Sequence, residues 1–432
     1  MPLTAQRIAD RSCTIGIIGM GYVGLPLGLV FCEAGHRVLG FDIDAEKVKH
    51  LGAGTSYIRH IGAHRVSDAV AAGRLAATSD FARAADCDAL IICVPTPLDD
   101  HLQPDLRFIV GTCEAIAPHL TPGALVVLES TTWPGTTVEV VKPILERDGR
   151  LRDGDNLHLC FSPEREDPGN ARFSTRTIPK LVGGTSAAGR DLAVALYGSA
   201  IDTIVPVSST QVAEMAKLFE NIFRGVNIAL VNELKIVLDR MGIDVWEVIR
   251  AASTKPFGFM PFYPGPGLGG HCIPLDPFYF SWKAKEFGLN TRFIELAGEI
   301  NRAMPAFVVA KVQDCLNTHG KPLNGSRILI LGMSYKADID DLRESPSLEL
   351  MRQLEAKGAT VSYHDPHIAV LHATREHPTY AGRRSVEPSP AFDCLLLATA
   401  HRGYTAASLL GHGVPVVDTR NVLPRGPLVY PA

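Results

Sequence analysis

A cysteine follows a glycine-rich turn in the stretch GPGLGGHCIPLD, Gly265 to Asp276. Four of its first six residues are glycine, so the backbone there can approach another molecule closely. Pro274 suits the first turn of a helix, which predicts that Cys272 lies just outside the positive N-terminal end of that helix. Because a helix N-terminus lowers the pKa of a thiol, the stretch predicts a nucleophilic cysteine. A buried structural cysteine is the alternative.

Three other stretches supply groups that such chemistry requires. In EMAKLFENIFR, Lys217 and Asn221 are four positions apart and share one face of a predicted helix. A cation and an amide there can stabilise an oxyanion or hold a water molecule, although a solvated helix face is the simpler alternative. Glu164 in SPERED follows the strand-like LHLCF, and a carboxylate at a strand end can activate water. Thr131 in ESTTWPGTT also follows a strand and is expected to bind that water or a nicotinamide.

The turn GMGYVG, Gly19 to Gly24, follows a predicted strand and opens a predicted helix. A dinucleotide site needs this context, because the turn brings the backbone close to the pyrophosphate and a helix N-terminus faces it. Asp42 ends the next strand, 18 positions after Gly24, where a carboxylate binds both ribose hydroxyls and repels a 2′-phosphate. The pattern favours NAD over NADP, and a glycine turn needed only for packing is the alternative. The expected cofactor-binding residues here are Gly19, Met20, Gly21, Tyr22, Val23, Gly24 and Asp42.

A dinucleotide domain combined with Cys272 indicates that an aldehyde is oxidised by covalent catalysis. The thiolate attacks the aldehyde carbon to give a thiohemiacetal, a hydride leaves to NAD to give a thioester, and water releases the acid.

Apolar runs alternate with helical patterns at both ends of the chain, which predicts parallel, doubly wound sheets. A long pattern from about 209 to 240 predicts a helix that joins domains or packs against a partner chain. At Arg327 the strand–turn–helix order restarts with RILILG, but with a single glycine, so that unit suits another nucleotide or none. The expected α/β fold has two Rossmann-like doubly wound domains joined by a long central helix and a helical middle domain. The expected ranges are 1–205 for NAD, 206–320 for the middle domain and 321–432 for the C-terminal domain.

Composition narrows the class of protein. The chain has 432 residues, a formal charge of −4 and 46% hydrophobic residues, which indicates a multidomain globular protein and argues against nucleic-acid binding. Its nine cysteines include no CxxC pair, and no apolar signal segment opens the chain, so we expect a reducing, cytoplasmic location without membrane attachment. The uncharged run from 14 to 31 contains the glycine turn and is interpreted as strand plus helix. His36, His271, His364 and His367 form no ligand-spaced set with cysteines, so no metal is expected.

Seven motifs, in order, resemble those of the nucleotide-sugar 6-dehydrogenases, the family of UDP-glucose and GDP-mannose dehydrogenases. The resemblance covers nearly the whole chain and implies oxidation of CH2OH to COOH at sugar C6 with two NAD per sugar. It also implies a dimer, or a higher homo-oligomer, formed through the middle helix. The motifs are GMGYVGLPL, VPTP, STTWPGTT, SPERE, KLFEN, GGHCIPLD and SYKADIDDLRESPS.

The resemblance assigns roles to individual residues of the site. Cys272 resembles the family nucleophile, Lys217 and Asn221 the oxyanion- and water-binding pair, and Thr131 and Glu164 the partners of that water. Asp276 resembles the carboxylate that completes the set, a role that rests on the resemblance alone. Lys217, Asp276 and a bound water all remain candidates for the base of the first oxidation.

The resemblance also implies contacts with the cofactor and with the UDP-sugar. Thr96 of VPTP, Thr131 and Arg343 are expected at the cofactor. Glu164, Lys217 and Asn221 are expected to touch the substrate as well as to act on it. The other substrate-binding residues implied are Lys255, Gly265, Gly267, Gly269, Gly270, Tyr335 and Lys336, with the glycine loop cradling the sugar diphosphate by its backbone N–H groups.

The motif SPEREDPGN differs from the pattern SPEFLREG that is usual in the glucose branch. With GPGLGGHCIPLDPFYFSWKAKEFG, it resembles the branch that acts on UDP-N-acetylglucosamine, and this choice rests on resemblance alone. UDP-glucose and UDP-N-acetylmannosamine remain alternatives. A dehydrogenase of small hydroxy acids would not need Cys272, and a catalytically dead NAD- or nucleotide-binding regulator should have lost Cys272, Lys217 or Asn221.

Overall fold

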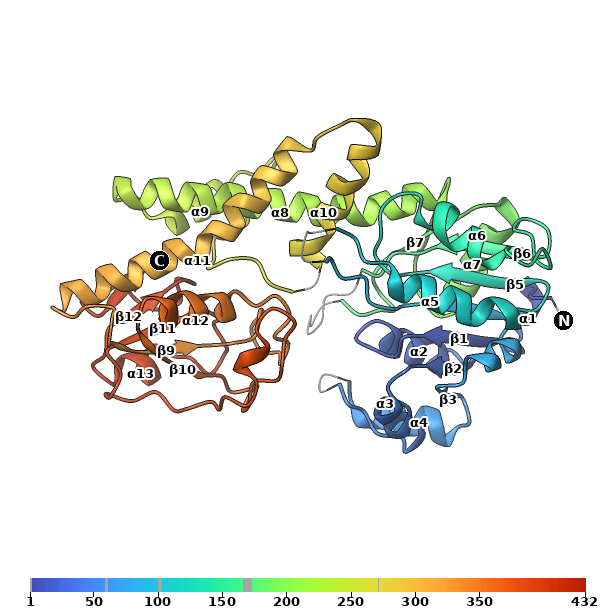
Figure 1. Ribbon diagram of the computed structural model, residues 1–432, viewed down its shortest axis with the longest axis horizontal. Coiled ribbons are helices and arrows are strands. Elements are labelled where there is room, and N and C mark those ends of the chain that lie inside the picture. Colours follow the sequence, from blue (N-terminus) through green and yellow to red (C-terminus); the bar gives the residue numbers. More distant parts are fainter. Residues whose placement is uncertain (1, 59–60, 100–102, 166–172, 271) are drawn as a thin grey trace. The chain divides into compact units, whose positions relative to one another are not determined.

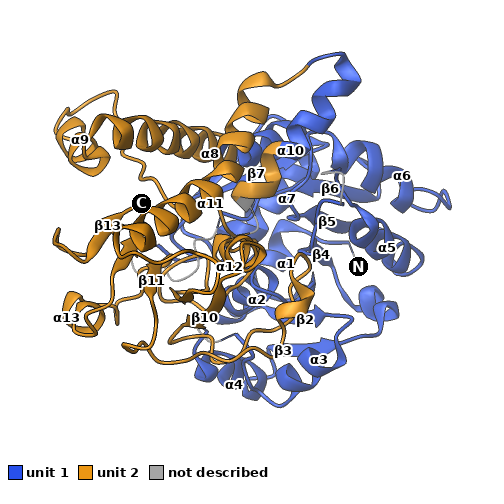
Figure 2. Ribbon diagram, turned by 60° about the vertical axis from the view of Figure 1, so that its left-hand side comes forward, with its two compact units in different colours: residues 1–220, 278–289 blue, residues 221–277, 290–432 orange. Residues whose placement is uncertain are grey.

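The computed structural model describes residues 2–58, 61–99, 103–165, 173–270 and 272–432 (Figure 1). The described chain divides into two compact units, which are coloured separately in Figure 2. The first unit comprises residues 1–220 and 278–289, and the second comprises residues 221–277 and 290–432. Two long helices, α8 and α10, therefore contribute residues to both units.

A mostly parallel sheet forms the centre of the first unit, with the strand order β3-β2-β1-β4-β5-β6-β7-β8. All neighbouring strands run parallel except β6 and β7. The order reverses beside β1, which is the topological switch point where ligands gather in such sheets. The strands are β1 Thr14–Ile18, β2 Arg37–Phe41, β3 Leu75–Thr78, β4 Ala89–Ile92, β5 Ala124–Leu128, β6 Leu157–Phe161, β7 Lys180–Gly184 and β8 Ile204–Val207.

Helices cover both faces of this sheet, which explains why its central strands read as unbroken apolar runs. Alternate residues face opposite sides: Ile15 and Ile17 enter one hydrophobic cluster and Ile18 enters the other. Helices α1 to α4 and α7 contribute to the first cluster, and α5 and α6 to the second. The helices are α1 Ala5–Ala9, α2 Gly24–Glu33, α3 Ala45–Gly52, α4 Ala63–Ala71, α5 Arg107–Ile116, α6 Lys142–Leu145 and α7 Ala187–Gly198, with a π-helix at Thr137–Val141.

Four helices follow the first sheet in the sequence. Helix α8 spans Thr210–Met241, 32 residues, and α9 spans Val245–Ala252 with the Asp244 side chain as its N-cap. Helix α10 spans Cys272–Ala284, and α11 spans Arg292–Thr318. The unbroken length of α8 agrees with the long helix predicted from the sequence.

The second unit contains a parallel sheet with the strand order β10-β9-β11-β12-β13. Helices α11 and α12 pack on one face of this sheet and α13 on the other. Ser345 caps α12, where Pro346 occupies the first helical position. The elements are β9 Arg327–Leu331, α12 Pro346–Ala356, β10 Thr360–His364, β11 Cys394–Leu397, α13 Ala406–Leu410, β12 Val416–Asp418 and β13 Val429–Pro431.

The predicted fold, with two doubly wound α/β sheets and a helical middle, is confirmed. The three residue ranges proposed for the domains stay a prediction. One local detail was wrong: α10 begins at Cys272 itself, so this residue opens the helix rather than preceding it, and Pro274 falls in the first turn as expected. The Cys272 side chain and His271 lie outside the part of the chain that the structure describes.

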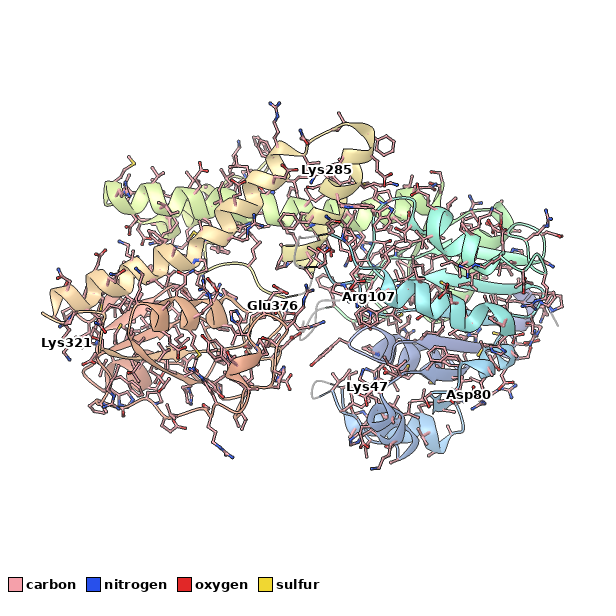
Figure 3. All side chains as sticks on the ribbon, viewed as in Figure 1. Lys47, Asp80, Arg107, Lys285, Lys321 and Glu376 are labelled. Carbon is pink, nitrogen blue, oxygen red and sulfur yellow. The ribbon has the colours of Figure 1, made fainter. Side chains whose placement is uncertain are left out.

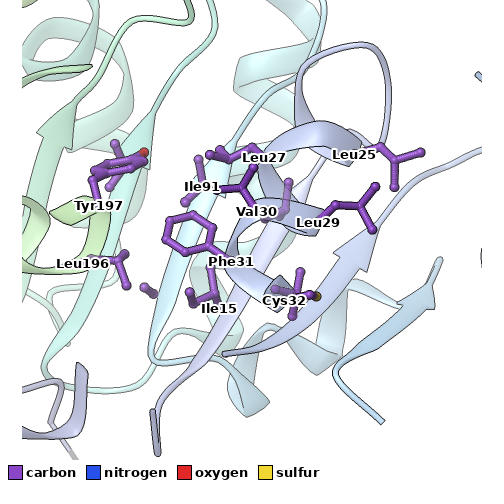
Figure 4. Packing of buried hydrophobic residues seen from close by; sticks show 14 of the residues in the cluster. Ile15, Leu25, Leu27, Leu29, Val30, Phe31, Cys32, Ile91, Leu196 and Tyr197 are labelled. Atoms are coloured by element: carbon purple, nitrogen blue, oxygen red, sulfur yellow. The ribbon is translucent and has the colours of Figure 1, made fainter. Parts of the chain in front are cut away.

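Phe31 of α2 is fully buried in the first hydrophobic cluster, beside Tyr197 at 5.9 Å between ring centroids (Figure 4). We expect Phe31→Ala to lower the free energy of unfolding by about 3–5 kcal/mol, because the lost contacts leave a cavity. Ile43→Ala, at a side chain that is 78% exposed, should change it by less than about 0.5 kcal/mol. Urea unfolding followed by circular dichroism measures both, and equal effects would contradict the packing described.

Candidate active site

The glycine turn after β1 has the shape that a dinucleotide requires. Gly19 has a φ of +94°, and a Cβ there would lie 2.6 Å from the carbonyl oxygen of Cys93. A Cβ on Gly24 would lie 2.0 Å from the carbonyl oxygen of Gly19. A Cβ on Gly21, by contrast, would meet nothing within 4 Å. The turn is therefore tight at both ends and open in the middle, which fits a pyrophosphate lying against the backbone at the start of α2.

The carboxylate of Asp42 lies directly after β2 and is almost buried. One oxygen accepts the Met20 N–H at 3.0 Å and the Lys47 ammonium at 3.2 Å, while the other accepts the Asp44 N–H at 3.0 Å. Tyr57 donates its hydroxyl to the carbonyl oxygen of Met20. Asp42 thus stands beside the glycine turn, where the sequence predicted a ribose contact. Sequence reasoning missed Lys47, which Figure 3 labels, because only the fold shows that it reaches back to Asp42.

An aromatic group supports the loop that contains Thr96. The Tyr279 hydroxyl donates to the Thr96 carbonyl oxygen at 2.6 Å, and both residues are buried. Trp133, in the loop after β5, stacks on Tyr279 and lies 4.7 Å from Trp282 between ring centroids. The indole nitrogen of Trp133 is buried and has no hydrogen-bond partner among the described residues. Sequence reasoning missed this aromatic group. The aromatic-rich segment PFYFSW, which lies within α10, could have indicated it.

Lys217 and Glu164 meet in the first unit, as the sequence predicted for two groups of one site. The Lys217 ammonium donates to the Glu164 carbonyl oxygen at 2.6 Å and lies 3.4 Å from its carboxylate. The next residue, Arg165, forms an ion pair with Glu220 of α8. Helix α8 therefore holds the segment after β6 at two successive residues.

Glu214 fixes the start of α8 to the loop that carries Thr131. Its carboxylate is buried and accepts the N–H groups of Gly135 at 2.6 Å and Thr137 at 2.9 Å, together with the Thr137 hydroxyl at 2.7 Å. Burial raises the pKa of Glu214, and these hydrogen bonds oppose the rise. Because Glu214 precedes Lys217 by one helical turn, the same bonds orient the lysine.

Asn221 and Asp276 form a buried pair in the second unit. The Asn221 amide donates to the Asp276 carboxylate at 2.5 Å, and their exposed fractions are 5% and 1%. Asp276 follows Cys272 by one turn of α10. In the sequence, only the family resemblance pointed to Asp276, and its contact with Asn221 now supplies an independent reason to include it.

The glycine loop from 265 to 270 is held by hydrogen bonds inside the second unit. The Gly265 N–H donates to the Asn232 side chain at 3.1 Å, and the Gly270 N–H donates to the Arg343 carbonyl oxygen at 3.0 Å. A Cβ on Gly270 would lie 2.9 Å from the Tyr335 ring, so glycine is required for packing there. Two of the four predicted N–H groups are thus engaged within the protein, and the predicted diphosphate cradle stays a prediction.

An arginine that sequence reasoning missed lies against this loop. A Cβ on Gly265 would be 2.8 Å from a terminal nitrogen of the Arg420 guanidinium. The Arg420 Nε donates to the Ala398 carbonyl oxygen at 2.7 Å, which aims the guanidinium toward the loop, and burial lowers its pKa to about 10. A guanidinium placed there is suited to bind an anionic substrate. The feature of the sequence that could have indicated Arg420 is the segment DTR at the end of an apolar, strand-like run.

The remaining predicted contacts are distributed over the second unit. The Tyr335 N–H donates to the Asp341 carbonyl oxygen at 3.0 Å, and the Lys336 carbonyl oxygen accepts the Ser334 hydroxyl at 2.8 Å. The Arg343 guanidinium binds the Asp341 carboxylate through Nε and Nη2. Lys255, beyond α9, is exposed and lies over the Phe257 ring. The predicted roles of Tyr335, Lys336, Arg343 and Lys255 stay predictions.

Comparison with known proteins decides the family. Three domain models match the chain: the NAD binding domain over residues 13–201, the central domain over 211–303 and the UDP binding domain over 329–425. The chain belongs to the UDP-glucose/GDP-mannose dehydrogenase family. The family resemblance of the motifs is confirmed, and so is NAD as the cofactor. The protein is an NAD-dependent nucleotide-sugar dehydrogenase.

Individual relatives match over most of their length. The chain is 36% identical to a UDP-N-acetyl-D-glucosamine 6-dehydrogenase of Pseudomonas aeruginosa, over 90% of this chain and 91% of that protein. It is 36% identical to an NDP-N-acetyl-D-galactosaminuronic acid dehydrogenase of Ralstonia nicotianae, over 83% and 84%. The solved UDP-D-ManNAc dehydrogenase of Pyrococcus horikoshii superposes with a TM-score of 0.86 at 32% identity, over 96% and 97%. The names of these relatives differ in the sugar, so similarity alone leaves the sugar open.

Two further features of the described residues concern a membrane and a metal. No helix in the described ranges is long and apolar enough to cross a membrane. Asp338, His367 and His401 could offer three ligand atoms within 4.8 Å of one another. His401, however, accepts the Asp338 N–H at one ring nitrogen and lies 3.2 Å from the Asp365 carboxylate at the other. Both nitrogens are engaged in the protein, so no metal site is proposed there.

Glu344 gives the second unit a pH-dependent stability. Burial, followed by the neighbouring Glu376 carboxylate, raises the pKa of Glu344 to about 7, and Arg375 opposes the rise (Figure 3 labels Glu376). The folded protein therefore binds an extra proton between about pH 4.5 and pH 7, and stability falls as the pH rises through this range.

We expect Glu344→Gln to remove this loss, which is on the order of 3 kcal/mol in the free energy of unfolding. The variant should gain stability over the wild type at pH 8 and not at pH 4.5, as measured by urea unfolding at both values. Glu247→Gln, at an exposed carboxyl of the same unit, is the matched control. A wild-type stability that does not fall between pH 4.5 and pH 8 would contradict the assignment.

Proposed function

We propose that this dehydrogenase oxidises the C6 hydroxymethyl group of UDP-N-acetylglucosamine to the uronic acid, in a four-electron reaction through a cysteine thioester. The observation that carries the proposal is the buried pair of Asn221 and Asp276, one helical turn beyond Cys272. Burying an amide and a carboxylate is unfavourable unless each is hydrogen-bonded. A hydrogen-bonded pair of these two groups beside a helix N-terminus therefore indicates a functional site.

The residues of the chain divide the reaction between them. NAD, when bound, accepts one hydride in each of the two oxidations. The Cys272 thiolate adds to the aldehyde carbon, and Lys217 and Asn221 donate hydrogen bonds to the oxygen that becomes negative. Thr131 holds a water molecule, and Glu164 accepts its proton as the water oxygen attacks the thioester carbon. The carbon–sulfur bond then breaks, and its electron pair returns to the Cys272 sulfur.

The other contacts follow from the same proposal. The turn from Gly19 to Gly24 and Asp42 hold the dinucleotide, with Thr96 and Arg343 as further contacts. Arg420 joins Tyr335, Lys336, Lys255 and the glycine loop as a group for the UDP-sugar. Residues 1–205 would bind NAD, 206–320 would form the middle domain, and 321–432 would hold the nucleotide of the substrate. The matched ranges 13–201, 211–303 and 329–425 support this division.

The choice of sugar rests on the relatives. The three relatives described above carry the names of N-acetylated sugars, which supports a 2-acetamido sugar over UDP-glucose. The Pseudomonas aeruginosa relative supports the gluco configuration. UDP-N-acetylmannosamine is the second candidate, because the Pyrococcus horikoshii structure matches nearly the full length of this chain.

With NAD in excess and the sugar limiting, we expect two NADH per UDP-N-acetylglucosamine, measured by absorbance at the end point. Two NADH are required because alcohol to acid removes four electrons. Cys272→Ser should still bind NAD in a titration but should form no acid, since an alcohol cannot replace the thiolate under these conditions. One NADH per sugar in the wild type, or full acid formation by Cys272→Ser, would contradict the covalent mechanism. Turnover of UDP-N-acetylmannosamine alone would change the sugar and keep the mechanism.

A homodimer formed through α8 is also proposed. Phe223, Leu230, Leu234, Val237 and Met241 repeat at intervals of seven, four, three and four, which places them on one face of the helix. All five side chains are at least 40% exposed in the single chain. A second copy of the same helix would bury this stripe, as packed helices with such spacing do.

Val237→Glu should weaken the dimer at least tenfold, because it buries a carboxylate in the stripe. Val370→Glu is the matched control, since Val237 and Val370 are 49% and 42% exposed and only the first lies on α8. Sedimentation velocity over a dilution series measures both. A wild-type chain that sediments as a monomer, or a Val237→Glu dimer of unchanged affinity, would contradict the interface.

A further inference from the structure

A buried ion pair lies behind the loops that carry Thr131 and Glu164. The Lys180 ammonium lies 2.9 Å from the Glu129 carboxylate, and the Tyr197 hydroxyl donates to the same oxygen at 2.5 Å. Lys180 also lies over the Tyr197 ring, 5.0 Å from its centroid. The exposed fractions of Lys180, Glu129 and Tyr197 are 8%, 2% and 0%. Every described partner of this ion pair belongs to the first unit.

The pair connects two loops that are distant in the sequence. Glu129 directly follows β5 and precedes Thr131 by two positions. Lys180 opens β7, and besides its ion pair with Glu129 it donates a hydrogen bond to the Pro163 carbonyl oxygen at 3.3 Å. Pro163 directly precedes Glu164. One ammonium group therefore ties the end of β5 to the segment after β6.

Lys180 is one of two buried lysines that hold this segment. Lys217 donates to the carbonyl oxygen of Glu164, the residue next to Pro163. The Ser162 hydroxyl donates to the Leu181 carbonyl oxygen at 2.7 Å and supports the segment from the same strand as Lys180. The backbone before Glu164 is thus fixed from β7, and the backbone at Glu164 is fixed from α8.

Packing alone does not explain a charged pair in this place. A buried ion pair loses much of its attraction to desolvation, and apolar side chains of similar volume are often as stable. Hydrogen bonds define the distance between the groups they join, whereas apolar contacts do not. The distance that Lys180 defines is the one between the Thr131 loop and the Glu164 segment.

We propose that Lys180 is a positioning residue for thioester hydrolysis, because its bonds to Glu129 and Pro163 set Glu164 at the correct distance from Thr131. The inference rests on the proposed function, in which Glu164 takes a proton from water as the water attacks the thioester carbon. In the proposed function, that water acts only after the thioester has formed. Loss of Lys180 should therefore slow the release of acid and leave the two preceding oxidations fast.

Rapid mixing of Lys180→Met with NAD and UDP-N-acetylglucosamine is the test. We expect a burst of two NADH for each active site, then steady turnover at least tenfold slower than in the wild type. Intact-protein mass spectrometry should show an adduct of one oxidised UDP-sugar, as Glu164→Gln should. The Kd for NAD should not change, and Lys180→Arg, which keeps a cation for Glu129 and a donor for the Pro163 carbonyl oxygen, should restore most of the turnover.

The double variant Glu129→Gln/Lys180→Met separates positioning from folding. Lys180→Met alone leaves the Glu129 carboxylate buried without its cation, so lost stability could slow the enzyme. The double variant removes both charges and should melt near the wild-type temperature, while the bond to Pro163 stays absent. We expect it to hydrolyse the thioester slowly and to accumulate the adduct. Hydrolysis at the wild-type rate would overturn the proposal.

The wild type and Glu164→Gln distinguish the two possible failures. If the wild type gives two NADH per sugar and Glu164→Gln accumulates the adduct, a double variant without the adduct refutes only the role of Lys180. If Glu164→Gln also turns over without an adduct, the proposed hydrolysis and the role of Lys180 are refuted together.

Discussion

Helix α8 inverts the usual arrangement of an amphipathic helix, and the candidate site depends on this inversion. The buried side of the helix carries a row of polar residues beside apolar ones such as Leu218 and Ile222, whereas the opposite face has an apolar stripe that is exposed in the single chain. Burial of polar groups is unfavourable unless each group finds a hydrogen-bond partner. The chain around α8 must therefore supply such partners. The buried polar residues of α8 are Thr210, Glu214, Lys217, Asn221, Asn232 and Lys235.

Those partners are the loops that would perform the chemistry. Glu214 binds the loop after β5, and Lys217 binds the segment after β6. Within the second unit, Asn221 binds Asp276, and the Asn232 side chain accepts the Gly265 N–H and donates to Asn301. The hydrogen bonds that satisfy the buried polar groups of α8 are thus the same bonds that order the loops. A site built in this way is ordered before substrate arrives, which is what catalysis by fixed donors requires.

The sequence predicted the local elements of structure but could not predict which distant residues pair with each other. The glycine turn, the strand that Asp42 follows and the extent of α8 follow from short patterns of residues, and the structure agrees with them. Glu129 and Lys180 are 51 positions apart, and neither residue type shows which partner it takes until the strand order is known. Arg420 is hidden for the same reason, because its relation to Gly265 spans more than 150 residues. The exact start of α10 at Cys272 is a boundary of one or two residues, which a proline in the first turn does not fix.

The support given to Glu164 also bears on how a general base can be positioned. Two lysines bind the backbone of this segment: Lys217 donates to the Glu164 carbonyl oxygen at 2.6 Å and lies 3.4 Å from its carboxylate, and Lys180 donates to the Pro163 carbonyl oxygen at 3.3 Å. A cation bound tightly to a carboxylate stabilises its charged form and makes it a weaker base. Fixing the same residue through its backbone defines where the carboxylate lies at a smaller cost in basicity. Two buried lysines can therefore stand close to Glu164 without removing the capacity of its carboxylate to accept a proton, which its proposed role requires.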